Sequence, residues 1–407
     1  MVMLVILILG GTAMLLNALN STSPQLAREK VTADAMLKAK EALIGYAVTY
    51  ADTHTNVSGF LPCPDEGQNN SEDGITNSSC GIDADGIVRS NISAIGKLPW
   101  KTLKISPLMD GNGECLWYAV SGNYKYNPNT ELMNWDNNGL FQIMSPDGVS
   151  LIPGSSASNQ PVAVIFSPGS PLGTQSRNSL TKAPSCGGNY TTSNYLDNDT
   201  IHGINNTAIS TTENAVTQLI SGQVKNLSGN EIVNDRMLII TKDDIFNAIK
   251  KRNDFESFIT SSLIGKAVTC LNLATLPDPI SINFDTMGES TGTTQGMGMN
   301  QHIAGRIKES SCTDNSVRKW RDNLAYTKCS SGMPCLSINS ASCRGAIIFT
   351  GQQSTSQNRI SNTQKNDWNN YLEGGALNIF TSATTSISGA TTYNPSAPST
   401  DLIACIP

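Results

Sequence analysis

Residues 1–51 read MVMLVILILGGTAMLLNALNSTSPQLAREKVTADAMLKAKEALIGYAVTYA, and this stretch decides the fold. Its first part, Val2–Leu19, carries no charged side chain, and Thr12 and Asn17 are its only polar interruptions. As a helix this part would be about 27 Å long, close to the hydrocarbon thickness of a bilayer. We therefore expect an apolar N-terminal helix.

A cleavable secretory signal is one interpretation of the apolar run. Such a signal has a basic segment before its apolar core, whereas only Met1 and Val2 precede this one. Removal of a basic leader ahead of Met1 would explain the missing positive flank. The apolar run would then be retained, and Leu7 and Leu15 would belong to the surface that drives assembly.

Beyond the apolar run, the sequence predicts an amphipathic continuation of the helix. Ser23 and Pro24 form either an N-cap with proline at the first helical position or a kink in one long rod. Residues 1–51 would then span about 75 Å. The predicted buried face repeats at helical spacing and consists of Val31, Ala35, Ala39, Ala42, Tyr46 and Tyr50.

The composition of the 407-residue chain excludes some functions. Charged residues make up 15% and the net charge is −6, so no basic surface is expected for a nucleic acid backbone. The chain is long enough for one large domain or two ordinary ones. Asn, Ser, Thr and Gly dominate after residue 52, as in exported proteins.

Ten cysteines follow the apolar run, with no CxxC spacing, so disulfides are favoured over zinc thiolates. Local spacing favours two pairs, Cys63 with Cys80 and Cys329 with Cys335. A weaker prediction joins Cys270 to Cys312. Connectivity cannot be derived from sequence, so the remaining four are left to pair among themselves: Cys115, Cys186, Cys343 and Cys405.

Several blocks of sequence carry a resemblance to a known family. They are AKEALIGYAVTYAD (39–52), GFLPCPDEG (59–67), GKLPWKTLKI (96–105), DGNGECLWYAVSGNYKYN (110–127), AVIFSPGSPLGTQSR (163–177) and NDRMLIITKDDIFNAIKKR (234–252). With the N-terminal helix, they resemble type IV pilins and type II secretion pseudopilins, specifically large prepilin-type proteins. The resemblance covers about residues 1–255.

The resemblance implies an α+β fold in which a long N-terminal helix packs on a large, disulfide-rich, β-containing globular head. It also implies processing by a prepilin peptidase, residence in the inner membrane, and assembly by pilus machinery into an extracellular filament. The assembly helix would include Val5, Leu7, Leu15 and Pro24. Pilins usually carry glutamate at the fifth mature position, which is Val5 if Met1 is the first mature residue.

Within the head, strands are predicted at Leu116–Val120, Val162–Phe166 and Met237–Ile240. A capping box at Thr241–Asp244 opens a helix that buries Ile245 and Ile249, and a second helical pattern follows at Phe255, Phe258, Ile259 and Leu263. Residues 52–96 are predicted to pack as loop and edge rather than core, and residues 278–301 are predicted as a long loop. The expected division is an assembly helix (1–51), a first head unit (52–240), a helical connection (241–272) and a second head unit (273–407).

An internal echo supports two related units. AVIF (163–166) is followed by Gly169, Gln175, Arg177 and Asn194-Tyr195-Leu196-Asp197, and AIIF (346–349) is followed in the same order by Gly351, Gln357, Arg359 and Asn370-Tyr371-Leu372-Glu373. This order favours an internally duplicated pilin-like head. Chance similarity between two buried strands is the alternative.

No catalytic motif is recognised, and the three histidines are isolated, so we expect no enzyme and no cofactor. Two loops have oxygen ligands at alternate positions, as calcium sites do, so a structural calcium is one hypothesis. Asx-turns explain the same patterns equally well. The candidate ligands are Asp83 and Asp85 in one loop and Asp110, Asn112 and Glu114 in the other.

Two functions follow from the resemblance. In the first, the chain is a structural subunit that assembles through its N-terminal helix into a type IV pilus-like filament with its head exposed. In the second, it is a minor or tip pilin, or a pseudopilin, whose large head binds a surface or a secreted substrate.

Overall fold

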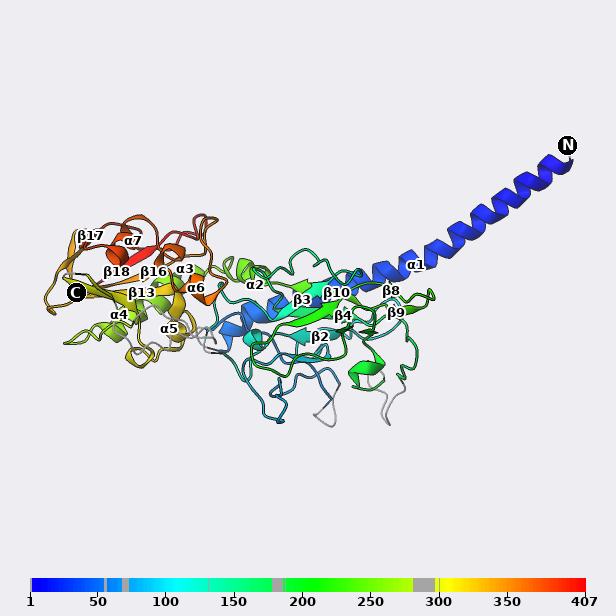
Figure 1. Cartoon of the computed structure of the whole chain (residues 1–407), viewed down its shortest axis with the longest axis horizontal. Coiled ribbons are helices and arrows are strands. Elements are labelled where there is room, and N and C mark those ends of the chain that lie inside the picture. The colour runs from blue at the N-terminus through cyan, green and yellow to red at the C-terminus, as the bar shows by residue number, and fades with distance from the viewer. Residues whose placement is uncertain are drawn as a thin grey trace.

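The computed structural model describes residues 2–54, 57–67, 73–130, 132–177, 186, 188–280, 297–299 and 301–407, with the backbone alone at 2–23, 297–299 and 362. Figure 1 shows one long N-terminal helix, α1, followed by a head of mixed α and β structure. All ten cysteines form disulfides. The α+β fold with an N-terminal helix and several disulfides is as predicted.

Helix α1 (Val2–Thr49) runs through Pro24 without a break, so Ser23 and Pro24 do not begin a separate helix. Its 48 residues span about 72 Å. The predicted face is partly wrong, because Val31 is 51% exposed. The buried stripe instead consists of Thr32, Ala35, Met36, Ala39, Leu43, Ala47 and, just after the helix, Tyr50.

The first head unit is built on a four-stranded antiparallel sheet, on which the second half of α1 packs. Helix α1 contacts the third and fourth strands of this sheet, β4 and β10, in the order given next. The strands, in spatial order, are β1 (Ala94–Lys97), β2 (Trp117–Val120), β4 (Ala163–Ser167) and β10 (Arg236–Ile240).

The second unit repeats this arrangement, with β11 (Met297–Met299) added at one edge. A helical segment made of α3 (Phe255–Ser257), the π-helical η4 (Phe258–Gly265) and α4 (Lys266–Leu271) packs on the two strands that correspond to β4 and β10. The segment 241–272, predicted as a helical connection, therefore contains the helix that packs on the second sheet. The repeated strands are β12 (His302–Arg306), β13 (Leu324–Cys329), β16 (Gly345–Phe349) and β18 (Leu402–Ile406).

Short strands and helices complete both units. In the first unit these are β3 (Phe141–Met144), β5 (Asn198–Asp199), β6 (Ile204–Asn205), β7 (Thr217–Ile220), β8 (Val224–Lys225), β9 (Glu231–Val233) and α2 (Lys242–Ile249). In the second they are α5 (Asn315–Lys319), β14 (Leu336–Ile338), β15 (Ala341–Cys343), α6 (Asn362–Lys365), α7 (Gly374–Thr381) and β17 (Ser386–Ile387).

The predicted capping box opens α2. The Thr241 side chain accepts a hydrogen bond from the Asp244 amide, and the Asp244 carboxylate accepts one from the Thr241 amide. Ile245 and Ile249 are buried, as predicted. Because these local bonds satisfy otherwise free amides, the helix start is encoded within four residues.

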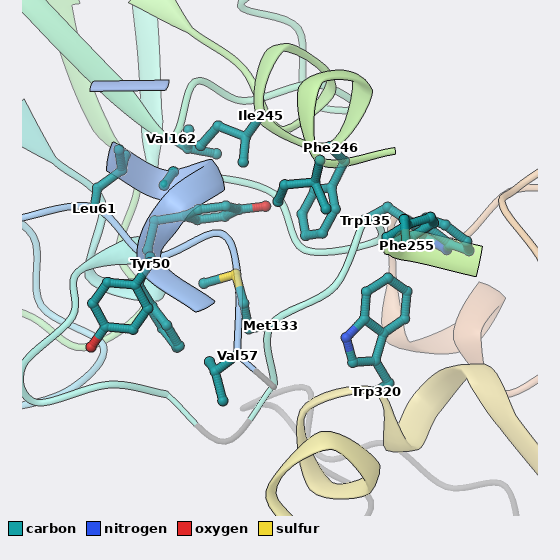
Figure 2. Close-up of a cluster of buried hydrophobic side chains, with 14 of the residues drawn as sticks. Tyr50, Val57, Leu61, Met133, Trp135, Val162, Ile245, Phe246, Phe255 and Trp320 are labelled. Carbon is teal, nitrogen blue, oxygen red and sulfur yellow. The ribbon is translucent and has the colours of Figure 1, made fainter. Parts of the chain in front are cut away.

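A single hydrophobic core joins the two units (Figure 2). Trp135 of the first unit lies edge-on to Trp320 of the second, with ring centroids 4.8 Å apart. Phe246 of α2 and Phe255 of α3 pack around the same pair. The units therefore share buried apolar surface, which is the main source of stabilisation between packed elements.

Two loop predictions need correction. Residues 52–96 do not pack only as loop and edge, because Phe60 and Leu61 are fully buried in the core shared with α1. Phe60 and Leu61 lie between Gly59 and Pro62 in a turn-rich stretch, and turn residues of this kind predict a loop. The loop predicted at 278–301 lies mostly outside the described residues, although the chain forms β11 within it.

Candidate functional site

The candidate site is the N-terminal helix and the surface that fixes it to the head. The Lys40 ammonium lies 2.9 Å from the Asp244 carboxylate and donates to the Ile239 carbonyl at 3.0 Å. Asp244 is also the capping-box residue of α2. A single carboxylate therefore fixes the start of α2 against the C-terminal half of α1.

The C-terminal end of α1 is held by Arg252, which follows α2. Its guanidinium donates to the Val48 carbonyl at 2.9 Å and pairs with Asp52 and Asp254, each at 2.8 Å. A cation at this end also opposes the negative end of the helix dipole. The helix end and the chain leading to the second unit are thereby joined.

Close backbone approach holds the middle of α1. The Gly111 amide donates to the Thr32 hydroxyl at 2.9 Å. A Cβ atom at Gly111 would lie 2.2 Å from the Arg28 carbonyl oxygen, so only glycine fits there. The exposed Glu29–Arg236 pair at 3.2 Å adds a contact beside it.

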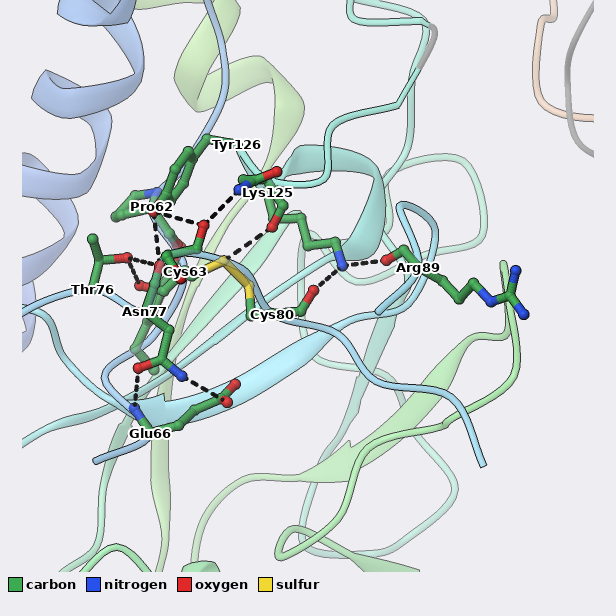
Figure 3. The surroundings of a disulfide bond; sticks show 12 residues. Pro62, Cys63, Glu66, Thr76, Asn77, Cys80, Arg89, Lys125 and Tyr126 are labelled. Carbon is green, nitrogen blue, oxygen red and sulfur yellow. Dashed lines mark hydrogen bonds between the residues drawn. A yellow bond between two sulfur atoms is a disulfide. The ribbon is translucent and has the colours of Figure 1, made fainter. Parts of the chain in front are cut away.

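The Cys63–Cys80 disulfide closes a loop against the same core (Figure 3). The fully buried Lys125 ammonium donates to the carbonyls of Cys80 and Arg89. Burial lowers the pKa of Lys125 to about 8, although attraction to Glu66 opposes the shift. Burial likewise raises the pKa of Glu66 to about 7. Lys125 thus ties the disulfide loop to the chain that follows β2.

The other disulfides brace both units. Cys329–Cys335 and Cys270–Cys312 form as predicted, and the latter joins α4 to the segment before α5. The four cysteines left open pair as Cys115–Cys186 and Cys343–Cys405. Both of these close long loops, of sequence separation 71 and 62, which local spacing could not identify.

The echoed residues occupy corresponding places in the two units. The Arg177 side chain donates to the carbonyls of Gly169 (2.7 Å) and Asn194 (2.8 Å), and its guanidinium lies over the Tyr195 ring. In the second unit, Arg359 donates to the carbonyls of Gly351 and Asn370 and lies over Tyr371, and it is fully buried.

The strand part of the echo is displaced by one residue. Phe166 packs in the cluster on the outer face of the first sheet, whereas Phe349 packs in the core that faces the helices. Ile165, which faces the helices, therefore corresponds to Ile347. Shifting a strand by one residue moves every side chain to the other face of the sheet. The match of AVIF with AIIF by residue type is therefore one residue out of structural register.

The two units also share a tyrosine-to-proline hydrogen bond that was not predicted from the sequence. The Tyr118 hydroxyl donates to the Pro62 carbonyl at 3.1 Å, and the Tyr326 hydroxyl donates to the Pro277 carbonyl at 2.9 Å. The sequence does carry a signal for this correspondence, because the pattern Leu-Pro-x-Pro occurs at 61–64 and again at 276–279. The helices that pack on the two sheets also repeat, as LIGYAVT at 43–49 and LIGKAVT at 263–269.

The segment 132–136 of the first unit docks on the second. The Met133 amide donates to the Lys319 carbonyl at 3.0 Å, and the Asn134 side chain donates to Asp322 at 2.6 Å. Asp136 accepts from Asn323 at 2.7 Å and pairs with Arg359 at 2.9 Å. In the first unit, the corresponding arginine pairs with a carboxylate of its own unit, Glu114, at 3.3 Å.

The candidate calcium ligands have the geometry of Asx-turns. Asp83 accepts from the amides of Asp85 and Ile87 and pairs with Arg89. Among the described residues, no three His, Cys, Asp or Glu side chains converge as a metal site. Calcium binding stays a hypothesis, which a melting curve at millimolar calcium tests.

The Asp110 loop is equally satisfied by protein donors. One carboxylate oxygen of Asp110 accepts from the amides of Asn112 and Glu114. The other accepts from the Ser167 hydroxyl and the Gly169 amide. Asp110 thereby connects the turn before β2 to the end of β4.

The predicted assembly residues are only partly described. The side chains of Val5, Leu7 and Leu15 lie outside the described part of the structure, and Pro24 is exposed. Within the part that is described, no helix has both the length and the apolar character needed to cross a bilayer.

Comparisons with family models, curated proteins and solved structures found no match to this chain.

Proposed function

We propose that the chain is a structural subunit of a type IV pilus-like extracellular filament. In this proposal the N-terminal helix lies in the inner membrane before assembly and then packs among the same helices of neighbouring subunits. A prepilin peptidase and the pilus assembly machinery would act on it, and the head would face outward.

The observation that carries the proposal is the division of α1 into two halves. The second half packs on the first sheet and is fixed by Lys40, Thr32 and the Val48 carbonyl. The first half extends away from the head in Figure 1, and its sequence, Val2–Leu19, has no charge. A helix with this division suits two apolar environments in turn, lipid and a helical bundle.

Substituting aspartate in the first half tests the proposal. Leu7→Asp and Leu15→Asp should each abolish filaments, because a carboxylate in lipid or in an apolar bundle costs about 2.5–3.5 kcal/mol. The head should remain folded. Leu227→Asp is the matched control, because Leu227 is fully exposed on the head. Normal filaments from either helix variant would contradict the proposal.

Truncation tests the division itself. A chain without residues 1–25 keeps the whole buried stripe from Thr32 onward, so it should be a soluble, disulfide-bonded monomer under oxidising conditions. Size-exclusion chromatography and circular dichroism measure this. Aggregation or unfolding of the truncated chain would show that the head depends on the first half of the helix.

A second candidate function is a minor or tip pilin, or a pseudopilin, whose head binds a surface or a secreted substrate. The observation that favours it is the position of the second unit, which lies at the end of the molecule away from the N-terminus of α1 (Figure 1). Electron microscopy of purified filaments with antibody against the head separates the two. Labelling along the whole shaft supports the first function, and labelling at one end supports the second.

A further inference from the structure

A polar pocket of about 320 Å³ lies where the two units meet. The first unit contributes Asn91, Asn123, Gln160 and Asn214 to its lining, and the second contributes Ile360 and Lys365. Small-molecule sites begin at about 300 Å³ and often lie between domains. The pocket therefore has room for one small ring.

Most of the polar groups around the pocket are uncharged amides with unused hydrogen-bonding capacity. Among the described residues, the side chains of Asn91, Gln160 and Asn214 make no hydrogen bond. Each amide places an N–H donor beside a carbonyl acceptor. Adjacent hydroxyl groups of a sugar present the same alternation of donor and acceptor, so the two are complementary.

Apolar side chains occupy the rest of the lining. Leu132 and Leu140 are buried at the pocket, and Ile360 is 39% exposed. A pyranose ring has C–H faces that pack on such groups while its hydroxyls reach the amides. A phosphate would need several cations, and Lys365 is the only Lys or Arg in the lining.

The pocket walls are fixed by the contacts between the units. Asp136, which lies in the lining, is held by Arg359 and Asn323. At Gly139, a Cβ atom would lie 1.7 Å from the Pro161 carbonyl oxygen, so the backbone there is tightly packed. A preformed site binds without first losing the entropy of ordering its walls.

We propose that this pocket binds one neutral pyranose ring, as the terminal sugar of a surface glycan. The proposal deepens the second candidate function, binding by the head, and it does not require filament assembly. Side-chain amides of the first unit form hydrogen bonds with the sugar hydroxyls, and Ile360 of the second unit packs on the C–H face of the ring. Sugar binding would then depend on both units being docked.

The test uses the full chain in a detergent without a sugar headgroup and saturation-transfer NMR with methyl glycosides of glucose, galactose, mannose and N-acetylglucosamine. At least one should bind, and Gln160→Ala and Asn214→Gly should each weaken binding about 3- to 10-fold. Glycine suits position 214 because its φ is +57°. Asn198→Ala, an exposed asparagine outside the pocket, should bind normally.

A second arm presents the same sugars as the ends of immobilised oligosaccharides. Retention on these supports recognition of a surface glycan, and binding of the free glycosides alone overturns that assignment. Absence of binding by all four sugars, or equal binding by wild type and both pocket variants, overturns the pocket itself. Filaments formed by the same variants, counted by electron microscopy, test the filament-subunit function separately from sugar binding.

Discussion

Asp136 of the first unit and Arg359 of the second form an ion pair of 2.9 Å whose two side chains are 3% and 0% exposed. Burial disfavours the ionised form of Asp136, but attraction by Arg359 and Lys242 outweighs burial and lowers its pKa. The arginine of a duplicated motif is thus neutralised by the other copy of the unit. Without the first unit, the buried Arg359 of the second unit would therefore lack its counter-charge, whereas Arg177 of the first unit pairs with Glu114 of its own unit.

Asp136→Asn should lower the free energy of unfolding by about 3–5 kcal/mol, because it leaves a buried guanidinium without its counter-charge. Urea unfolding followed by tryptophan fluorescence measures the change, since Trp135 and Trp320 lie at the same junction. The exposed pair gives the control: Glu29→Gln should cost about 1 kcal/mol or less. Equal losses in the two variants would show that burial does not matter here.

The stability should fall as the pH rises from 5 to 9. Burial raises the pKa of Asp401 to about 8 and that of Asp197 to about 6. Their partners Glu373 and Asp235 also have raised pKa values. Because the folded state holds these protons more tightly than the unfolded state, the contribution of these four carboxyl groups to stability is complete below their unfolded pKa values of about 4. That contribution is lost as the pH rises through the folded pKa values.

Asp401→Asn should therefore flatten the upper part of this profile, between about pH 6 and 9, since the amide cannot ionise. Its oxygen can still accept from the Glu373 amide, as Asp401 does now at 2.9 Å. Thermal melting at a series of pH values measures the profile. Asp85→Asn, at an exposed turn, is the control, and an unchanged slope in Asp401→Asn would refute the assignment.

Removal of the Cys343–Cys405 disulfide by two alanine substitutions should cost about 4 kcal/mol, against about 2 kcal/mol for Cys329–Cys335. The difference follows from their sequence separations of 62 and 6, because a longer loop restricts the unfolded chain more. Denaturant unfolding of the two double variants makes the comparison. A larger loss from the short loop would mean that local packing, and not chain entropy, dominates.

Ala39→Leu should destabilise the head by about 1–3 kcal/mol, because Ala39 is fully buried where α1 packs on the head. Val31→Leu should be nearly neutral, because Val31 is 51% exposed. Melting temperatures of the truncated chain compare the two substitutions without the first half of the helix. Similar effects at both positions would contradict the observed stripe.

Local sequence predicted much of the fold, because several elements are determined by neighbouring residues. The capping box at Thr241–Asp244 needs only four residues, and the three predicted strands, β2, β4 and β10, are short apolar runs between turns. Two disulfides, Cys63–Cys80 and Cys329–Cys335, close short loops and so could be proposed from spacing. The helical face was misplaced at Val31 because helical spacing fits more than one face when small residues are frequent.

Long-range features could not be predicted in the same way. The pairing of Cys115 with Cys186 and the docking of Asp136 on Arg359 depend on how distant segments fold together. The duplicated helix, in contrast, was visible as LIGYAVT and LIGKAVT but was overlooked beside the strand echo. The inter-unit pocket has no sequence signature, since its asparagines come from separate loops.

The way Arg252 is held has a mechanical consequence. The chain passes from the first unit to the second through residues 250–254, and Arg252 in this tether is bonded to the end of α1 at the Val48 carbonyl. A pull on the second unit therefore reaches α1 by two parallel routes, the tether itself and the docked segment 132–136. Because both routes share the load, we expect the two units to stay docked under tension and to transmit the force to α1 together. The connection at residues 250–254 should not extend on its own.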